Sequence, residues 1–351
     1  MDRRTTVAVS GLQAGTAPAP GLEVAFCLAE GPAVRIVGLD YDPLCTGLYA
    51  GSPFVATRHM PSPVRWPAFK RAFADFAAKN EIDIFIPCTD LDVLLLVERH
   101  QELAELGVAC LLPPNSSAKA LSKPLLAAQP YSGPFLLPRT ITLDGTRDLG
   151  LLDGLEYPLC VKGRFSGVQP APSPAAARLY AQSLAAASGW PVLAQQWITG
   201  DEYSVLGLAD TSSDLLGGAA MKKLGITETG ATWAGVTVEA PDLRETLARA
   251  LRQWAWVGPI ELDLIRSPEG LDYLVDVNMR FPAWTAVAKD AGANLPLLLV
   301  ALLEGDQPRP AWASSGLAFA INSEDRTMPV VRWLEALKGV DDDYEGFYRN
   351  V

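Results

Sequence analysis

Residues Gly258–Arg280 read GPIELDLIRSPEGLDYLVDVNMR. Two stretches in which apolar and polar residues alternate flank the turn sequence Ser267–Gly270, and this pattern predicts a β-hairpin. If the loop has four residues, the apolar side chains of the two strands coincide on one face, which supports this register; an odd-numbered loop would break it. The predicted opposite pairs are Arg266 with Leu271, Leu264 with Tyr273, Leu262 with Val275 and Ile260 with Val277.

The other face of this hairpin is predicted to be polar, because strand side chains alternate with period two. It would carry Glu261, Asp263, Asp276 and Asn278, and Arg280 continues the row. Carboxylate and amide oxygens suit Mg²⁺, which prefers one or two carboxylates together with nucleotide phosphates. A guanidinium two residues further on suits a phosphate oxygen. The alternative interpretation is the solvated outer face of an ordinary hairpin.

Length and composition limit the class of protein. The chain has 351 residues and a formal net charge of −11. The length suggests two or three lobes, and the acidic balance argues against a nucleic-acid partner. The longest dense apolar run, Leu295–Leu303, is far shorter than the ~20 residues of a membrane span. The apolar stretch Val7–Val9 after Arg3 and Arg4 is too short for a signal peptide, so we expect no membrane partner and a cytoplasmic location.

Cysteine and histidine offer little for catalysis. The chain has five scattered cysteines and two histidines, His59 and His100. With no CxxC pair, the cysteines fit buried, reduced thiols rather than a disulfide frame or a zinc site. A catalytic triad would need one of these two, and neither lies in a Ser or Cys nucleophile motif, so histidine-based catalysis is not expected.

The predicted elements divide the chain into an N-terminal α/β domain with a parallel sheet and a two-lobed α+β domain. In residues 1–115, strands at 6–9, 34–39, 82–86 and 108–112 alternate with helices at 22–30, 69–79 and 91–106, which implies parallel pairing. Residues 116–191 form a first lobe with a helix at 174–188. Residues 192–305 form a second, β-rich lobe that carries the hairpin, with helices at 242–257 and 295–303. Residues 306–351 are a C-terminal extension.

Taken in order, these motifs resemble the ATP-grasp superfamily, in particular its carbamoyl phosphate synthetase-like and D-alanine–D-alanine ligase-like members. The likeness covers residues 5–305. Such families hold two Mg²⁺ ions with an acidic residue and an acidic-x-Asn pair on adjacent strands, which match Asp263, Asp276 and Asn278 here. The usual motif is Glu-x-Asn-x-Arg, so Asp276 is a departure, and Glu261 on the same predicted face could compensate.

The resemblance also implies a nucleotide site. Lys123 would meet the ATP phosphates, and Lys162, before a shortened glycine-containing lid loop at 163–167, would reach the α- and β-phosphates and the adenine edge. Glu202 would bind the ribose hydroxyls. Lys222 is favoured over its neighbour Lys223 for the γ-phosphate, and Arg280 would act with it in catalysis. Backbone groups of the hinge residues Gln196, Trp197 and Ile198 would bind the adenine. Gln195, which precedes them, would also contact the adenine, and the family often has Glu at this position.

The activity that the resemblance implies is the ATP-dependent joining of a carboxylate to an amine through an acyl phosphate. The cofactor would be two Mg²⁺ ions, with Mn²⁺ as a substitute. The partners would be ATP and an amino acid, peptide or other small carboxylate, with the 230–238 segment on the substrate side and a homodimer as one possible assembly. Two alternatives stay open: an ATP-binding regulatory or scaffold protein that no longer ligates, and a kinase or carboxylase with the same nucleotide site.

Overall fold

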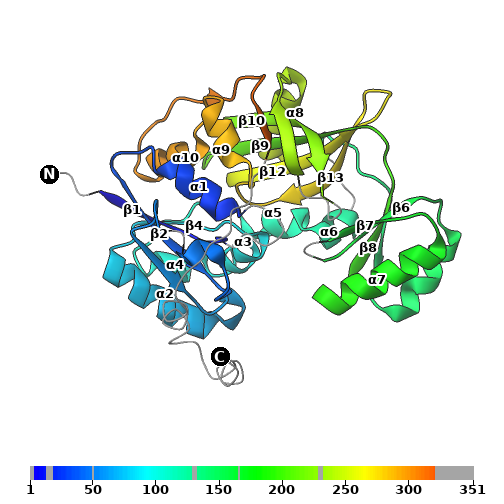
Figure 1. Cartoon of the computed structure of the whole chain (residues 1–351), viewed down its shortest axis with the longest axis horizontal. Helices are drawn as coiled ribbons and strands as arrows, with labels where there is room; N and C mark the ends of the chain where they lie inside the picture. Colours follow the sequence, from blue (N-terminus) through cyan, green and yellow to red (C-terminus); the bar gives the residue numbers. More distant parts are fainter. Residues whose placement is uncertain are drawn as a thin grey trace.

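The computed structural model describes residues 4–12, 19–49, 51–128, 133–164, 167–227 and 232–320. Most of the predicted C-terminal extension, the centre of the predicted lid loop and the start of the 230–238 segment lie outside the described residues. Within them the chain forms three β-sheets (Figure 1). No helix among these residues is both long and apolar enough to cross a membrane.

The N-terminal sheet is parallel, as predicted, with strand order β3-β2-β1-β4. Helices lie between its strands because a parallel connection needs a crossover. Its strands are β1 (Thr5–Val9), β2 (Val34–Asp40), β3 (Ala56–His59) and β4 (Ile84–Ile86), with helices α1 (Pro20–Leu28), α2 (Trp66–Asn80), α3 (Asp90–Leu96) and α4 (His100–Ala104) and the 3-10 turns η1 (Thr46–Tyr49) and η2 (Pro63–Arg65).

Two predicted elements of this domain differ from the structure. The helix predicted at 91–106 is divided, because α3 ends at Leu96 and α4 begins at His100. The strand predicted at 108–112 is reduced to one bridge, between Ala109 and Ile84. Val108, Cys110 and Leu111 are nevertheless buried, so burial produced the strand-like pattern without a full ladder of hydrogen bonds.

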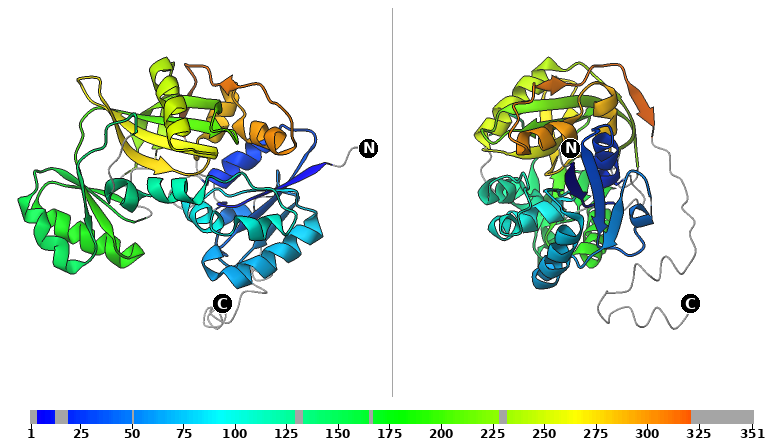
Figure 2. Two further views of the ribbon diagram at one scale, coloured as in Figure 1. Left: turned by 180° about the vertical axis from the view of Figure 1, so that it is seen from behind. Right: turned by 90° about the vertical axis from the view of Figure 1, so that its left-hand side faces the viewer.

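The lid sheet is a separate lobe with strand order β5-β8-β6-β7, and α7 packs on one of its faces (Figures 1 and 2). The predicted lobe boundary at residue 191 falls just before β8, which pairs with β5 and β6, so this sheet extends to Gln196. The elements are β5 (Thr140–Leu143), η3 (Thr146–Gly154), β6 (Leu159–Lys162), β7 (Val168–Ala171), α7 (Pro174–Ser188) and β8 (Val192–Gln196). Helices α5 (Asn115–Leu121) and α6 (Lys123–Ala128) connect this lobe to the N-terminal domain.

The large sheet has seven strands and includes the predicted hairpin, β12 and β13. Its strands are β9 (Asp201–Ala209), β10 (Leu215–Ile226), β11 (Thr232–Thr237), β12 (Gly258–Arg266), β13 (Asp272–Asn278), β14 (Ala311–Trp312) and β15 (Ala318–Ala320), and its helices are α8 (Pro241–Gln253), α9 (Thr285–Asp290) and α10 (Leu295–Leu303).

The two faces of the large sheet bury different cores. Val205, Leu262 and Leu264 belong to a core that α8 covers. On the other face, Leu206 and Met221 join a core that reaches the N-terminal sheet and α10. The large sheet and the N-terminal domain therefore share one core, while the lid lobe projects away from both (Figure 2). Side chains on this second face that lie beyond the shared core are free to form a site.

Candidate active site

The hairpin forms where it was predicted, but the predicted register is wrong. Arg266 pairs with Asp272, so five residues connect the strands instead of four. Asp263 pairs with Asp276 and Leu264 with Leu274, which leaves Val275 as an extra, bulged residue. A bulge of this kind shifts the alternation by one residue. Leu274 is thereby turned into the apolar core that α8 covers.

The bulge brings the polar residues of the hairpin into two opposite pairs. Asp263 lies opposite Asp276, and Glu261 lies opposite Asn278. Directly opposite residues of an antiparallel pair project from the same face, with Cβ atoms about 5 Å apart. This row of four side chains, called the charged face below, lies on the side of the large sheet away from α8.

Each carboxylate of the charged face contacts a cation from a different element. Lys123 Nζ at the start of α6 lies 3.0 Å from Asp276 Oδ2. Lys223 Nζ on β10 lies 2.9 Å from Asp263 Oδ1, which also accepts a hydrogen bond from Ser204 Oγ. Burial opposes the charge of both lysines, but the facing carboxylates outweigh it and raise the pKa of Lys123 and of Lys223.

Glu261 is the most enclosed carboxylate of the face. Its Oε1 accepts a hydrogen bond of 2.6 Å from Trp284 Nε1, and its Oε2 accepts one of 3.0 Å from Asn278 Nδ2. Arg280 Nη1 lies 3.4 Å from Oε2, and Arg280 Nη2 donates to Asn278 Oδ1 at 3.1 Å. Burial, followed by the charge of Asp263, raises the pKa of Glu261 to about 7. Glu261 on β12 thus holds the side chains of Asn278 and Arg280 in place.

The prediction that Lys222 rather than Lys223 faces the site is wrong. Adjacent residues of a strand project to opposite faces. Lys222 pairs with the exposed Asp201, whereas Lys223 is 5 % exposed and contacts Asp263. Alternation predicts that the two lysines project to opposite faces, but the face that carries the carboxylates depends on how β10 pairs with β9.

Lys162 crosses from the lid sheet to the large sheet. Its Nζ donates a hydrogen bond of 2.7 Å to the carbonyl oxygen of Val275, the bulged residue of β13. The side chain is buried, and burial lowers the pKa of Lys162 even though Asp276 opposes the shift. The bulge therefore exposes a main-chain acceptor at the point where the two sheets approach.

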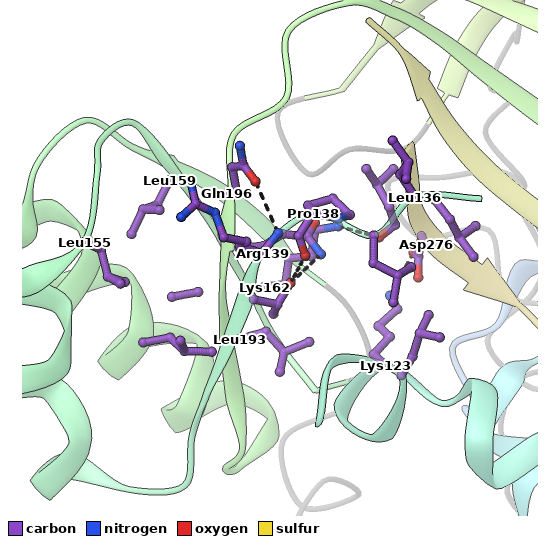
Figure 3. Close-up of a pocket in the computed structure, with 18 of the residues that line it drawn as sticks. Lys123, Leu136, Pro138, Arg139, Leu155, Leu159, Lys162, Leu193, Gln196 and Asp276 are labelled. Atoms are coloured by element: carbon purple, nitrogen blue, oxygen red, sulfur yellow. Dashed lines mark hydrogen bonds and ion pairs between the residues drawn. The ribbon is translucent and has the colours of Figure 1, made fainter. Parts of the chain in front are cut away.

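A cavity of about 880 Å³ lies between the lid sheet and β13. Its volume falls within the range typical of small-molecule sites, roughly 300–1,000 Å³. Figure 3 shows Lys123 and Asp276 on one side of it and Leu155 and Leu159 of the lid lobe on the other. The predicted residues that line it are Lys123, Lys162, Gln195, Gln196 and Asp276.

The hinge residues differ in how they are held. Gln196 accepts a hydrogen bond at Oε1 from Arg139 N (3.2 Å) and donates its own N–H to Arg139 O (2.7 Å). Gln195 is buried and donates to Thr140 Oγ1 at 3.1 Å. Trp197 is 43 % exposed. The main-chain N–H of Gln196 is therefore already used within the lid lobe.

Other predicted residues lie outside the cavity lining. Trp197, Ile198 and Glu202 follow β8 or begin β9. Asp263 and Asn278 belong to the charged face, and Arg280 follows β13. Glu202 is half-buried, and burial raises its pKa, opposed by Lys223 and Lys162. These two lysines belong to different sheets, so Glu202 lies where the sheets meet.

The oxygen donors of the charged face fit a hard cation in their chemistry. Asp263 and Asp276 are opposite each other, and Asn278 adds an amide oxygen. No group of three or more His, Cys, Asp or Glu side chains converges as a ready-made cage anywhere in the described residues. Mg²⁺ prefers one or two carboxylates completed by phosphate oxygens. Binding would require each aspartate to exchange its lysine partner for the ion.

Several residues of the site were not identified from the sequence. Asp90, at the start of α3, accepts a hydrogen bond of 2.5 Å from Met279 N, and its Oδ2 lies 3.6 Å from Arg280 Nε. Trp284 and Ser204 hold Glu261 and Asp263. Asp90 lies four residues beyond the end of the buried strand β4, a place that corresponds to the carboxyl edge of the parallel sheet. Nothing in the sequence links it to a hairpin almost two hundred residues away.

No protein-family model matches the sequence, and no curated protein is detectably similar to it. Solved structures do resemble it. An L-amino acid ligase from Bacillus licheniformis has a TM-score of 0.63 and 15 % identity, over 87 % of this chain and 75 % of the other. The biotin carboxylase domain of 2-oxoglutarate carboxylase from Hydrogenobacter thermophilus has a TM-score of 0.65 and 12 % identity, over 89 % and 72 %.

N5-carboxyaminoimidazole synthetase from Staphylococcus aureus has a TM-score of 0.63 and 12 % identity, over 89 % of this chain and 80 % of the other. At such identities the likeness concerns the fold. The parallel N-terminal sheet, the lid sheet and the large antiparallel sheet occur in the order that the sequence motifs predict. The chain therefore has the fold of the ATP-grasp superfamily.

Proposed function

We propose that the protein is an ATP-dependent ligase that joins a carboxylate to an amine and releases ADP and phosphate. The observation that carries this proposal is the charged face of β12 and β13, where each carboxylate contacts a cation from a different element. These cations, Lys123 of α6, Lys223 of β10 and Arg280 after β13, can exchange their carboxylate partners for phosphate oxygens when a nucleotide binds. The fold shared with an amino acid ligase supports the same proposal.

The nucleotide is proposed to bind between the lid sheet and the charged face. Lys123 and Lys162 line the 880 Å³ cavity there and would contact its phosphates. Lys223 takes the place proposed for Lys222 near the γ-phosphate, because it lies on the charged face. Glu202 would accept the ribose hydroxyls, and the hinge backbone at Trp197 and Ile198 would face the adenine.

The metal is proposed to be Mg²⁺, as two ions, held by Asp263, Asp276 and Asn278; Mn²⁺ has the same donor preference. It would supply a Lewis acid that neutralises phosphate charge. A related biotin carboxylase domain binds MgADP, which supports the choice of ion. Glu261 would position Asn278 through its hydrogen bond of 3.0 Å.

The chemistry brings together groups of like charge. A carboxylate oxygen attacks the γ-phosphorus of ATP, the bond to the ADP oxygen breaks, and an acyl phosphate forms. The amine then attacks the acyl carbon, the bond to the phosphate oxygen breaks, and the amine proton passes to solvent. Lys123, Lys223 and Arg280 lower the repulsion between the carboxylate and the phosphates. No thiol is needed, and burial keeps the pKa of Cys88 well above its ordinary value.

The test measures ADP and phosphate release from Mg-ATP with a panel of amino acids, other small carboxylates and bicarbonate. Substrate-dependent ADP release that EDTA abolishes, and that the double variant Asp276→Asn, Asn278→Ala loses, is the expected result. ADP release that depends on bicarbonate alone would replace the ligase with a carboxylase. A stable phosphorylated product would replace it with a kinase.

A second measurement separates binding from catalysis. ATP should raise the melting temperature of the native protein. A protein that binds ATP but forms no ADP with any acceptor would instead be a binding protein, and a protein without affinity for ATP would contradict the whole proposal. The cytoplasmic location stays a prediction, as does homodimerisation, although the related carboxylase domain is a dimer.

A further inference from the structure

A second, smaller cavity adjoins the charged face. Its volume is about 300 Å³, and residues from the start of α3, the start of α6, the lid loop and β13 line it. Lys123 and Val277 line both this cavity and the 880 Å³ cavity. The two cavities therefore meet at Lys123, the lysine that contacts Asp276 of the charged face.

Most of the wall of this cavity is apolar. Leu91 and Leu94 lie three residues apart on α3, so their side chains share one face of the helix, and both are only half-buried. Met279 and Val277 close the opposite side and are 3 % and 4 % exposed. A half-buried pair of leucines that faces a cavity leaves apolar surface for a ligand to cover, which favours an apolar ligand body.

The charged groups of this wall favour an anion. Lys123 and Arg164 are the cations, and Asp90 is the carboxylate that faces them. Asp90 is already engaged by β13, because its Oδ1 accepts the Met279 N–H at 2.5 Å and its Oδ2 lies 3.6 Å from Arg280. Lys123 is likewise engaged, by Asp276, so all of these groups are counted together: two cations and one carboxylate give the wall a net positive charge, which suits a negatively charged end of a ligand.

We propose that this second cavity binds the carboxylate substrate and selects small carboxylates with an apolar body. The inference rests on the proposed ligase function and adds the substrate class to it. The carboxylate lies toward Lys123, where the two cavities meet and where the proposed function places the ATP phosphates. The apolar body lies against Leu91, Leu94 and Met279.

The volume suits a small substrate. About 300 Å³ is at the lower end of the range typical of small-molecule sites, roughly 300–1,000 Å³. Leucine and its desamino analogue 4-methylpentanoate are probes of this kind. Comparing them separates amino acids from simple carboxylic acids, because both have the same apolar body and carboxylate and only one has an α-ammonium group.

The experiment measures binding by calorimetry to the full-length protein with saturating Mg-ADP. The probes are leucine, 4-methylpentanoate, glutamate and lysine. In parallel, Mg-ATP and hydroxylamine are supplied with each probe, since hydroxylamine converts an acyl phosphate to a hydroxamate without the natural amine. The expected result is that leucine or 4-methylpentanoate binds and forms a hydroxamate, while glutamate and lysine do not.

Two tryptophan variants of α3 test the location. Leu94→Trp fills the cavity, and we expect it to weaken binding of the apolar probe at least about tenfold, the scale of steric discrimination in an apolar pocket. Leu95→Trp is the matched control, because Leu95 is also half-buried on α3 but does not line the cavity. Affinity for Mg-ADP should be the same in both variants.

The outcomes distinguish this inference from the proposed function. If no apolar carboxylate binds, if glutamate or lysine binds better, or if Leu94→Trp binds the apolar probe as well as Leu95→Trp does, the cavity is not the carboxylate site, although Mg-ADP binding still stands. Loss of Mg-ADP binding in the native protein would contradict the ligase proposal itself. Loss of Mg-ADP binding in Leu94→Trp alone would also overturn the inference, because the cavity would then serve the nucleotide.

Discussion

The N-terminal sheet and the large sheet both bury carboxylates, but they neutralise them in different ways. In the N-terminal domain the acidic groups lie at the end of a strand of the parallel sheet or in the helix that follows one, and the main chain and a hydroxyl hold them. In the antiparallel large sheet they lie along the strands, and lysine and arginine side chains from other elements hold them. Main-chain donors are fixed by the fold, whereas long cationic side chains can change partners.

Asp40 and Asp92 illustrate the first kind. Asp40 accepts hydrogen bonds from the main-chain N–H groups of Leu12 and Tyr41, each at 2.7 Å. Asp92 accepts one of 2.6 Å from Ser10 Oγ, and its Oδ1 has no hydrogen-bond partner among the described residues. These groups connect the loops after β1, β2 and β4, so we interpret them as structural.

Asp263 and Asp276 illustrate the second kind. Their partners, Lys223 and Lys123, come from segments about a hundred residues apart in the chain. A ligand that brings its own charge can displace such partners without unfolding a strand. We therefore propose that the large sheet binds the ligand, whereas the carboxylates of the N-terminal sheet organise its loops.

The largest effect is expected at the charged face. Asp276→Asn should lower the rate of substrate-dependent ADP release by at least about a hundredfold, the scale of losing one electrostatic group of an active site. Asp272→Asn on the same strand is the control, because Asp272 pairs with Arg266 outside the cavity. Equal activities of the two variants would show that the charged face takes no special part in the reaction.

A smaller effect is expected for Asp92, and it depends on pH. Burial raises the pKa of Asp92 to about 6 from an ordinary value of 3.8. Between these values the folded state retains a proton that the unfolded state releases, so this group lowers stability as the pH rises. From pH 4 to pH 7 the unfolding free energy of Asp92→Asn should therefore gain about 2 kcal/mol relative to the native protein.

Urea unfolding at both pH values measures this gain, with the exposed Asp75→Asn as the control. A difference between Asp92→Asn and the native protein that stays constant with pH would show that Asp92 does not titrate in this range.

Next in size is the comparison of the two neighbouring lysines of β10. Lys223→Met should reduce kcat/KM for ATP by roughly tenfold or more, because it removes a buried cation that faces Asp263. Lys222→Met should leave kcat/KM nearly unchanged, since Lys222 pairs with an exposed carboxylate on the other face. The reverse order of effects would contradict the orientation of β10.

The smallest effect is expected for an ion pair of the large sheet that lies away from the charged face. Arg266 contacts Asp242 through Nη2 at 2.5 Å, and the Asp242 side chain is 57 % exposed. Asp242→Ala should lower the free energy of unfolding by less than about 1 kcal/mol, because solvent screens exposed pairs. Urea unfolding checks this value, and a loss several times larger would mean that exposed pairs also hold the sheet together.

The sequence predicted the order of the elements because each signal is local. Alternation with period two placed Glu261, Asp263, Asp276 and Asn278 together, and the helices at 174–188 and 295–303 have the predicted bounds. Strands separated by helices predicted the parallel N-terminal sheet. The ATP-grasp fold followed from the order of these motifs along the chain, although the roles of the individual residues stay proposals.

Tertiary structure decided what local patterns leave open. Only strand pairing fixed the five-residue connection and the bulge at Val275, which aligned Asp263 with Asp276 and offered a carbonyl to Lys162. Pairing of β10 with β9 selected Lys223 over Lys222. The second cavity combines residues of α3, α6, the lid loop and β13, which are distant in the chain. Alternation determines which side chains share a face, but the face they present and the groups they meet depend on contacts between segments far apart in sequence.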